Sequence, residues 1–128
     1  MTRINQNSIF YHLYPLGACE APHRNDFNSM PVSRLQKMFD WLDHIQALGV
    51  NAIYLGPVFE STTHGYDTAN YYEVDRRLGT RQDLRDFALE LKRRGMALVL
   101  DGVFNHVGRD FWAFKDLLAH GQSSAYKD

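Results

Sequence analysis

Two short segments combine carboxylate, imidazole, amide and aromatic side chains, and each follows an apolar run typical of a buried strand. The first segment, His64–Tyr72, has the sequence HGYDTANYY, and the second, Asp101–His106, has the sequence DGVFNH. Aromatic faces cover the apolar side of a pyranose ring, while carboxylates, amides and imidazoles bind its hydroxyls. The two segments therefore indicate a sugar site, with aromatic faces from Tyr66, Tyr71 and Tyr72 and polar groups from Asp67, Asp101, Asn105 and His106.

Other roles for these residues stay open at this point. Asp67 lies in a Gly-containing segment typical of a turn, and Asp101 could cap the chain after its strand. Packing is the favoured role for Tyr71 and Tyr72. A catalytic metal needs several converging His and carboxylate ligands, which this sequence does not offer at suitable spacing, whereas calcium bound by oxygen donors is easier to build.

Strands and amphipathic helices are expected to position the two segments. Apolar side chains at three-to-four spacing predict helices, and short aromatic or β-branched runs predict strands. The expected strands are Ile9–Tyr14, Val50–Leu55 and Met96–Phe104, and the expected helices are Leu35–Leu48, 80–95 and Phe111–Leu118, with a long loop over 18–31 and a polar stretch over 60–75.

Capping signals are present at the start of the two longer helices. Ser33 and Gln36 have the spacing of a capping box, in which each side chain binds the other's backbone N–H. Thr80 with Asp83 predicts the cap of the second helix.

The alternation of strands and helices predicts a parallel α/β sheet, and the continuous apolar strands predict that both sheet faces are covered. Two architectures satisfy this order: an open doubly wound sheet and part of a closed (β/α)₈ barrel. The first strand is followed by Pro-Leu-Gly-Ala-Cys, which lacks the G-x-G-x-x-G of dinucleotide-binding folds. In either architecture, functional groups gather at the carboxyl ends of the strands.

The composition excludes several classes of partner. A net charge of -1 and a pI near 6.6 argue against nucleic acid or an anionic membrane, since both require clustered basic charge. Residues 1–7 have no apolar core, so we expect no signal peptide and a cytoplasmic location. The single cysteine, Cys19, cannot form an internal disulfide.

Three segments together resemble the α-amylase superfamily, glycoside hydrolase family 13. The stretch Leu48–Phe59, with the sequence LGVNAIYLGPVF, is similar to the second barrel strand of that family, and His64–Thr68 is similar to its sugar-binding loop. Asp101–His106 matches the family pattern D-x-V-x-N-H at every fixed position. The loops are most similar to the neopullulanase and cyclomaltodextrinase branch.

The resemblance implies a role for each matching residue. Tyr66 would stack on the glucose unit at the cleavage point, Asp67 would bind hydroxyls there, and His106 would hydrogen-bond the same sugar. Asp101 would orient the catalytic cluster without attacking the substrate, and Asn105 would stand where many members bind calcium. The substrate would be a malto-oligosaccharide or related α-glucan, hydrolysed or transferred with retention of configuration.

The sequence departs from the family pattern in one large respect. Retaining glycosidases use one carboxylate as nucleophile and another as acid/base. The family's nucleophile follows its fourth barrel strand in a G-x-R-x-D motif, and no expected strand of this chain is followed by one. Gly79–Asp83 has that spacing, but it lies at the expected start of a helix. We therefore expect residues 1–106 to form the first three βα units of a barrel that needs roughly 250 residues, and residues 107–128 to begin the inserted domain B.

Such a fragment would hold part of the substrate site, no catalytic carboxylate, and an exposed sheet edge that limits its stability without the remainder of the barrel. Two alternatives stay open: a non-catalytic carbohydrate-binding or interaction protein built on a partial barrel, and an α/β domain that is not a glycosidase.

Overall fold

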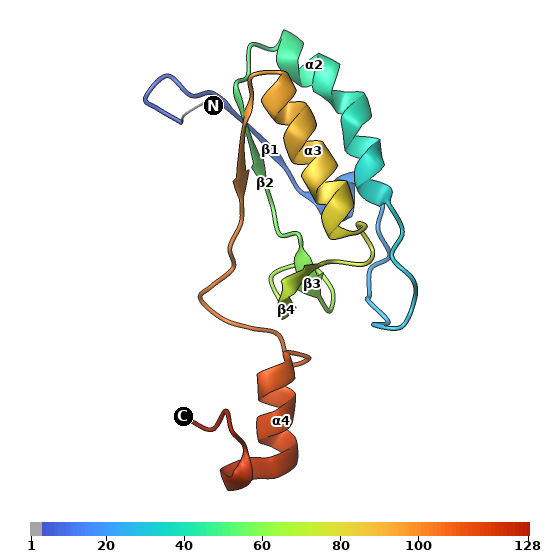
Figure 1. The fold of residues 1–128 in the computed structure, drawn as a ribbon, viewed down its shortest axis with the longest axis vertical. Helices are drawn as coiled ribbons and strands as arrows, with labels where there is room; N and C mark the ends of the chain where they lie inside the picture. Colours follow the sequence, from blue (N-terminus) through green and yellow to red (C-terminus); the bar gives the residue numbers. More distant parts are fainter. Residues whose placement is uncertain (1–3) are drawn as a thin grey trace.

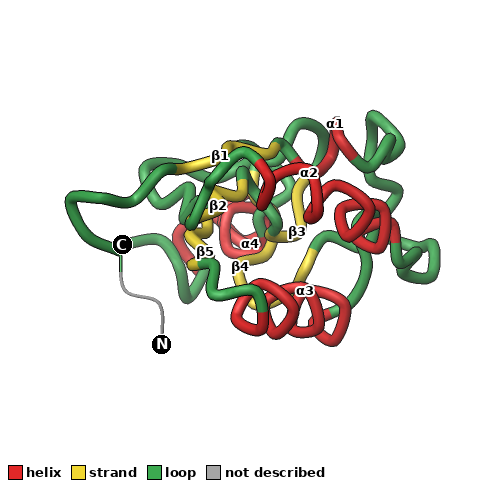
Figure 2. The backbone as a smooth tube through the Cα atoms, turned by 90° about the horizontal axis from the view of Figure 1, so that it is seen from above, coloured by secondary structure: helices red, strands yellow, loops and turns green. Residues whose placement is uncertain are grey.

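A parallel three-stranded sheet forms the centre of the molecule. The computed structural model describes residues 4–128. Residues 1–3, which belong to the N-terminal segment expected not to be a signal peptide, lie outside the described part. Strands β1 (Phe10–Leu13), β2 (Ala52–Leu55) and β5 (Ala97–Leu100) pair in the order β1-β2-β5 (Figures 1 and 2). The predicted parallel α/β sheet is confirmed.

The sheet has one face packed on helices and one open face. Tyr11, Ile53 and Leu98 lie in register and pack in the hydrophobic core with α2 (Leu42–Ala47) and α3 (Arg81–Arg93). Because side chains alternate along a strand, the neighbouring register row of His12, Tyr54 and Val99 points to the other face.

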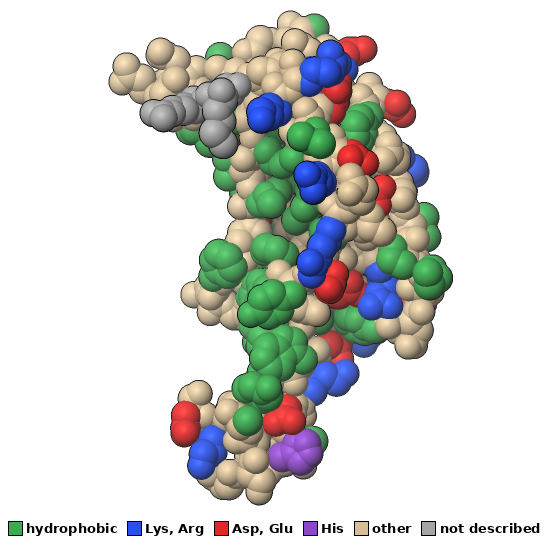
Figure 3. Space-filling view, in the orientation of Figure 1, with side chains coloured by type: hydrophobic (Ala, Val, Ile, Leu, Met, Phe, Trp, Pro, Cys, Tyr) green, Lys and Arg blue, Asp and Glu red, His purple; other side chains and the backbone are tan. Residues whose placement is uncertain are grey.

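In the described chain the helices α2 and α3 lie on one side of the strands (Figure 1), so the expectation that both faces are covered is wrong for these residues. The other side is hollowed, and hydrophobic side chains gather along it (Figure 3).

The segment between β1 and β2 differs from its prediction. The chain after β1 forms a short helix α1 (Pro15–Ala18), and the expected single helix over 35–48 is a 3₁₀ helix, η1 (Arg34–Trp41), followed by α2. The capping box of Ser33 and Gln36 is wrong, since Ser33 makes no side-chain hydrogen bond to the helix. A 3₁₀ segment lacks the i→i−4 geometry on which that box depends.

The second predicted helix is confirmed as α3, together with its cap. The hydroxyl of Thr80 accepts from the backbone N–H of Asp83, and the Asp83 carboxylate accepts from the Thr80 N–H at 2.7 Å. Phe87 on this helix meets Phe39 of η1 edge to face, with ring centroids 5.5 Å apart. The two helical segments are therefore packed on each other as well as on the sheet.

A β-hairpin, absent from the sequence prediction, occupies the polar stretch over 60–75. Its strands β3 (Phe59–Ser61) and β4 (Thr68–Val74) are antiparallel, and the first candidate segment covers the end of the loop between them and the start of β4. Polar sequence alone does not predict these strands, because the buried positions of the hairpin include the polar residues Glu60, Ser61 and Thr68.

The third strand of the sheet is shorter than predicted. β5 ends at Leu100, and the Asp101 N–H makes the last ladder bond, to the Leu55 carbonyl at 3.0 Å. Its neighbour β2 is followed by Gly56 and Pro57 and offers no further pairing. The predicted continuation to Phe104 is a loop for this reason.

The C-terminal part of the chain is a helix that lies beyond the hairpin. α4 (Trp112–His120) overlaps the predicted amphipathic piece, and a short 3₁₀ turn, η2 (Gly121–Ser123), follows it at the end of the molecule farthest from α2 (Figure 1). Within residues 4–128, no helix has the length and apolar character needed to cross a membrane.

A buried ion pair connects the hairpin to the rest of the fold. The Arg77 side chain, 4% exposed, donates from Nε to Oδ1 of Asp75 at 2.9 Å and from Nη2 to Oδ2 at 2.7 Å. The same guanidinium binds the carbonyl oxygens of Pro22, His23 and Thr63 at 2.9, 3.2 and 2.8 Å. Buried charges are tolerated only when they are paired and hydrogen-bonded in this way.

Replacing Arg77 with methionine is expected to lower the free energy of unfolding by about 3–5 kcal/mol, because the buried Asp75 carboxylate loses its partner. Urea denaturation followed by circular dichroism measures this change. The control is Arg81→Met, whose ion pair with Glu73 is exposed and worth less than about 1 kcal/mol. Equal losses in the two variants would contradict the assigned role of Arg77.

Candidate functional site

Asp101 stands at the carboxyl end of β5, where its carboxylate accepts hydrogen bonds from a side chain and from the backbone. The Tyr54 hydroxyl donates to Oδ2 at 2.7 Å, and the Val103 N–H donates to Oδ1 at 3.2 Å. The carboxylate is therefore held in place at the edge of the open sheet face, directly after β5.

Tyr54 is a site residue that the sequence analysis missed. It lies on the open face, where its ring stacks on His12 with centroids 4.6 Å apart and an interplanar angle of 19°. The signal was available in the strand alternation, since Tyr54 and His12 occupy one register row and Asp101 follows Val99 of that row by two residues.

The phenol of Tyr66 interacts with the same carboxylate. The pKa of its phenol is raised, chiefly by burial and then by the charge of Asp101 and a hydrogen bond to it. The pKa of Tyr54 is raised as well, chiefly by its hydrogen bond to Asp101. Tyr54 thus binds the carboxylate and Tyr66 lies near it, and both phenols remain protonated at neutral pH, able to donate hydrogen bonds.

Asp67 is fixed within the hairpin loop. Its carboxylate accepts from the Thr63 hydroxyl at 2.6 Å and from the Gly65 N–H at 3.3 Å. Burial alone would raise its pKa, but the hydrogen bonds, led by that from the Thr63 hydroxyl, lower it below the usual range. The group is an ionised acceptor with lone pairs left for ligand hydroxyls. Its bond to the Gly65 N–H also stabilises the loop, which is the turn role left open by the sequence.

His106 has both ring nitrogens engaged. Nε2 lies 2.9 Å from the Tyr66 carbonyl oxygen, and Nδ1 lies 3.1 Å from the Asn105 amide nitrogen. A carbonyl only accepts and an amide NH₂ only donates, so this pattern is satisfied by the neutral ring with its proton on Nε2. A sugar hydroxyl that binds His106 must displace one of these two partners.

Tyr71 connects the hairpin to the second segment. Its hydroxyl lies 2.6 Å from the carbonyl oxygen of Val103 and 3.1 Å from that of His106, while its ring contacts Phe104 and Phe111. Val103 has a φ of 47°, which is rare for a β-branched residue and indicates local strain. The expected packing role of Tyr71 is accompanied by this polar contact, whereas Tyr72 is largely exposed.

A cavity of about 480 Å³ lies between the hairpin loop and the chain after His106. Tyr66, Asp67 and His106 all line it, so the structure brings three of the four predicted binding residues together. Asp101 is adjacent through Tyr66 and is not a lining residue. The cavity is the candidate sugar site.

The metal-binding expectation finds little support in the geometry of this chain. Calcium requires six to eight oxygen ligands. Asn105 offers one amide group that contacts His106, and residues 4–128 contain no cluster of three His, Cys, Asp or Glu side chains able to hold a metal ion. The residues present do not fit a calcium site by themselves.

Known proteins similar to this chain share both its sequence and its fold. Residues 24–128 match the family model for the alpha amylase catalytic domain. A cyclomaltodextrinase from Bacillus sp. is 37% identical over 96% of the chain, and neopullulanase 2 from Thermoactinomyces vulgaris is 43% identical over 73%. The solved cyclic alpha-maltosyl-(1→6)-maltose hydrolase from Arthrobacter globiformis, in complex with cyclic alpha-maltosyl-(1→6)-maltose, has a TM-score of 0.79 and 37% identity over 94% of the chain.

The chain belongs to the α-amylase family of glycoside hydrolases and corresponds to part of its catalytic domain. The predicted family, the cyclomaltodextrinase and neopullulanase branch, and the fold as an N-terminal portion of a (β/α)₈ barrel are confirmed. The chain spans 25% of the Bacillus cyclomaltodextrinase, 16% of the neopullulanase and 30% of the solved hydrolase.

Replacing Asp101 with asparagine is expected to lower the pKa of Tyr54 towards its ordinary value, because the phenolate then no longer faces a carboxylate. The pKa of Tyr66 should fall less, since burial, the larger cause of its shift, remains. A pH titration of ring-labelled tyrosine by NMR measures both. Asp86→Asn, on the exposed side of α3, should leave both values unchanged, and an unchanged Tyr54 in Asp101→Asn would refute the arrangement.

Proposed function

We propose that the complete protein containing this chain hydrolyses or transfers α-glucosidic bonds in malto-oligosaccharides or related α-glucans, with retention of configuration. The observation that carries the proposal is the convergence of Tyr66, Asp67 and His106 on one cavity beside Asp101. Family membership supports the reaction class, and the solved relative holds a cyclic maltosyl sugar.

The residues of this chain would supply the sugar-binding part of that reaction. Tyr66 would cover one face of a glucosyl unit, the ionised Asp67 would accept from its hydroxyls, and the Nε2–H of His106 would donate after exchanging its contact with the Tyr66 carbonyl. Asp101, already bound by Tyr54, would act as a positioning group. The two carboxylates that retaining chemistry requires are assigned to no residue of this chain.

The remainder of the barrel would cover the open face of the sheet and complete the site. Residues 1–106 would be the first three βα units, and residues 107–128, which include α4, would begin domain B. We place the protein in the cytoplasm, supported by its similarity to an intracellular maltogenic amylase from Bacillus subtilis, which is 40% identical over 84% of the chain.

Sugar binding by the 128-residue chain tests the site. Maltotriose should bind, and Tyr66→Ala should weaken its binding roughly tenfold, because an aromatic face worth about 1 kcal/mol or more is removed. Isothermal titration calorimetry measures the affinity. Tyr72→Ala removes an exposed ring outside the cavity and should have no effect, whereas equal affinity of Tyr66→Ala and wild type would exclude Tyr66 from the site.

Turnover by the isolated chain tests the assignment of Asp101. A chromogenic α-glucoside should release no dye above the buffer rate, because neither a nucleophile nor an acid/base is assigned to these residues. Dye release that disappears in Asp101→Ala would instead make Asp101 a reacting group, and the positioning role would be wrong.

A further inference from the structure

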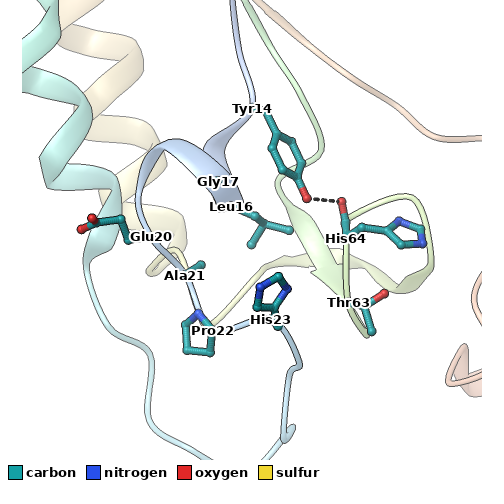
Figure 4. Close-up of a pocket in the computed structure, with 9 residues that line it drawn as sticks. All are labelled: Tyr14, Leu16, Gly17, Glu20, Ala21, Pro22, His23, Thr63 and His64. Carbon is teal, nitrogen blue, oxygen red and sulfur yellow. Dashed lines mark hydrogen bonds between the residues drawn. The ribbon is translucent and has the colours of Figure 1, made fainter.

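A second cavity, which we call the β1-loop pocket, lies between the chain that follows β1 and the loop that follows β3 (Figure 4). Its volume is about 460 Å³, within the usual range of small-molecule sites. It shares only Thr63 and His64 with the candidate sugar site, so these two residues form a wall between the cavities. The pocket is lined by Tyr14, Leu16, Gly17, Glu20, Ala21, Pro22, His23, Thr63 and His64.

Both walls of the β1-loop pocket are held by the same buried guanidinium. Arg77 donates to the carbonyl oxygens of Pro22 and His23 on one wall and to that of Thr63 on the other. The Tyr14 hydroxyl donates to the His64 carbonyl at 2.8 Å and joins the walls a second time (Figure 4). A pocket with walls fixed in this way loses little free energy to rearrangement when a ligand binds.

The lining combines apolar faces with one free polar group. Tyr14, Leu16 and Pro22 supply the apolar surface, and the His23 ring lies among these side chains near Thr63 (Figure 4). Within residues 4–128, the His23 imidazole makes no hydrogen bond, so it offers one donor and one acceptor to a ligand. Hydroxyl groups, which both donate and accept, are complementary to it.

The charge of the pocket favours a neutral ligand. Glu20 is the only carboxylate among its lining residues, and it is paired with Lys37 and points away from the other side chains (Figure 4). The His64 ring also points away, and it lines the candidate sugar site as well. What remains inside is an aromatic and aliphatic surface with an imidazole, which is the composition of a site for a neutral sugar.

We propose that the β1-loop pocket binds a second glucosyl unit. This inference rests on the proposed function, because it takes the ligand to be an α-glucan. The unit belongs either to the same oligosaccharide that occupies the candidate site or to a separate sugar, and the two sources share their recognition chemistry. Maltose and maltohexaose distinguish them, since only the longer sugar has units to spare beyond the candidate site.

The test uses the 128-residue chain, with Tyr66→Ala and His23→Ala made separately and together. His23→Ala removes the imidazole but keeps the backbone carbonyl that Arg77 binds. We expect His23→Ala to weaken maltohexaose binding roughly fivefold, because about one hydrogen bond is lost. The same loss is expected when His23→Ala is combined with Tyr66→Ala. An effect on maltohexaose alone assigns the unit to a spanning oligosaccharide, and an equal effect on maltose assigns it to a separate sugar.

The variants separate failure of this inference from failure of the proposed function. Unchanged affinities in His23→Ala, in both backgrounds, would overturn the β1-loop pocket while leaving Tyr66 and its site intact. An effect of His23→Ala without any effect of Tyr66→Ala would support the pocket and overturn the candidate site, and no binding of either sugar to the wild-type chain would overturn both. His44→Ala, on the exposed surface of α2, is the matched control, and unchanged circular dichroism verifies folding of each variant.

Discussion

The buried pair of Asp75 and Arg77 is the interaction on which the arrangement of loops depends. Arg77 reaches back 55 residues to Pro22 and 14 residues to Thr63, while Asp75 accepts from the backbone N–H and the hydroxyl of Ser61. Coulomb attraction alone would not offset the cost of removing these charges from water, but the surrounding hydrogen bonds satisfy both groups. The segments that carry Pro22, Ser61 and Thr63 are thereby given defined positions.

A short series of hydrogen bonds connects this pair to the candidate site. Thr63, whose carbonyl is bound by Arg77, donates its hydroxyl to Asp67, and the loop then turns Tyr66 towards Asp101. On the other side, Tyr71 of β4 contacts the carbonyls of Val103 and His106 and stabilises a segment that no strand supports. Side chains of the hairpin, more than the sheet itself, determine where the polar groups meet.

Most features set by local pattern were predictable from the sequence, the Ser33 capping box being an exception, and features set by distant contacts were not. The Thr80 cap of α3 and the three parallel strands follow from short motifs and periodicity, and three motifs predicted the family. The hairpin was not predicted because its polar residues, such as the buried Glu60 and Thr68, are typical of a surface loop. The end of β5 at Leu100 was not predicted because it depends on where β2 ends. Tyr54 was missed because a strand tyrosine resembles a packing residue until its register with Asp101 is known.

The separate hairpin also bears on how such a protein changes during evolution. The ladder of β1, β2 and β5 contains no residue of β3 or β4, so the hairpin hydrogen-bonds as its own two-stranded sheet. Substitutions and insertions between Thr62 and Asp67 can therefore reshape both cavities without disturbing the register of the parallel strands. Selection acting on that loop can alter ligand preference while the inherited scaffold remains unchanged.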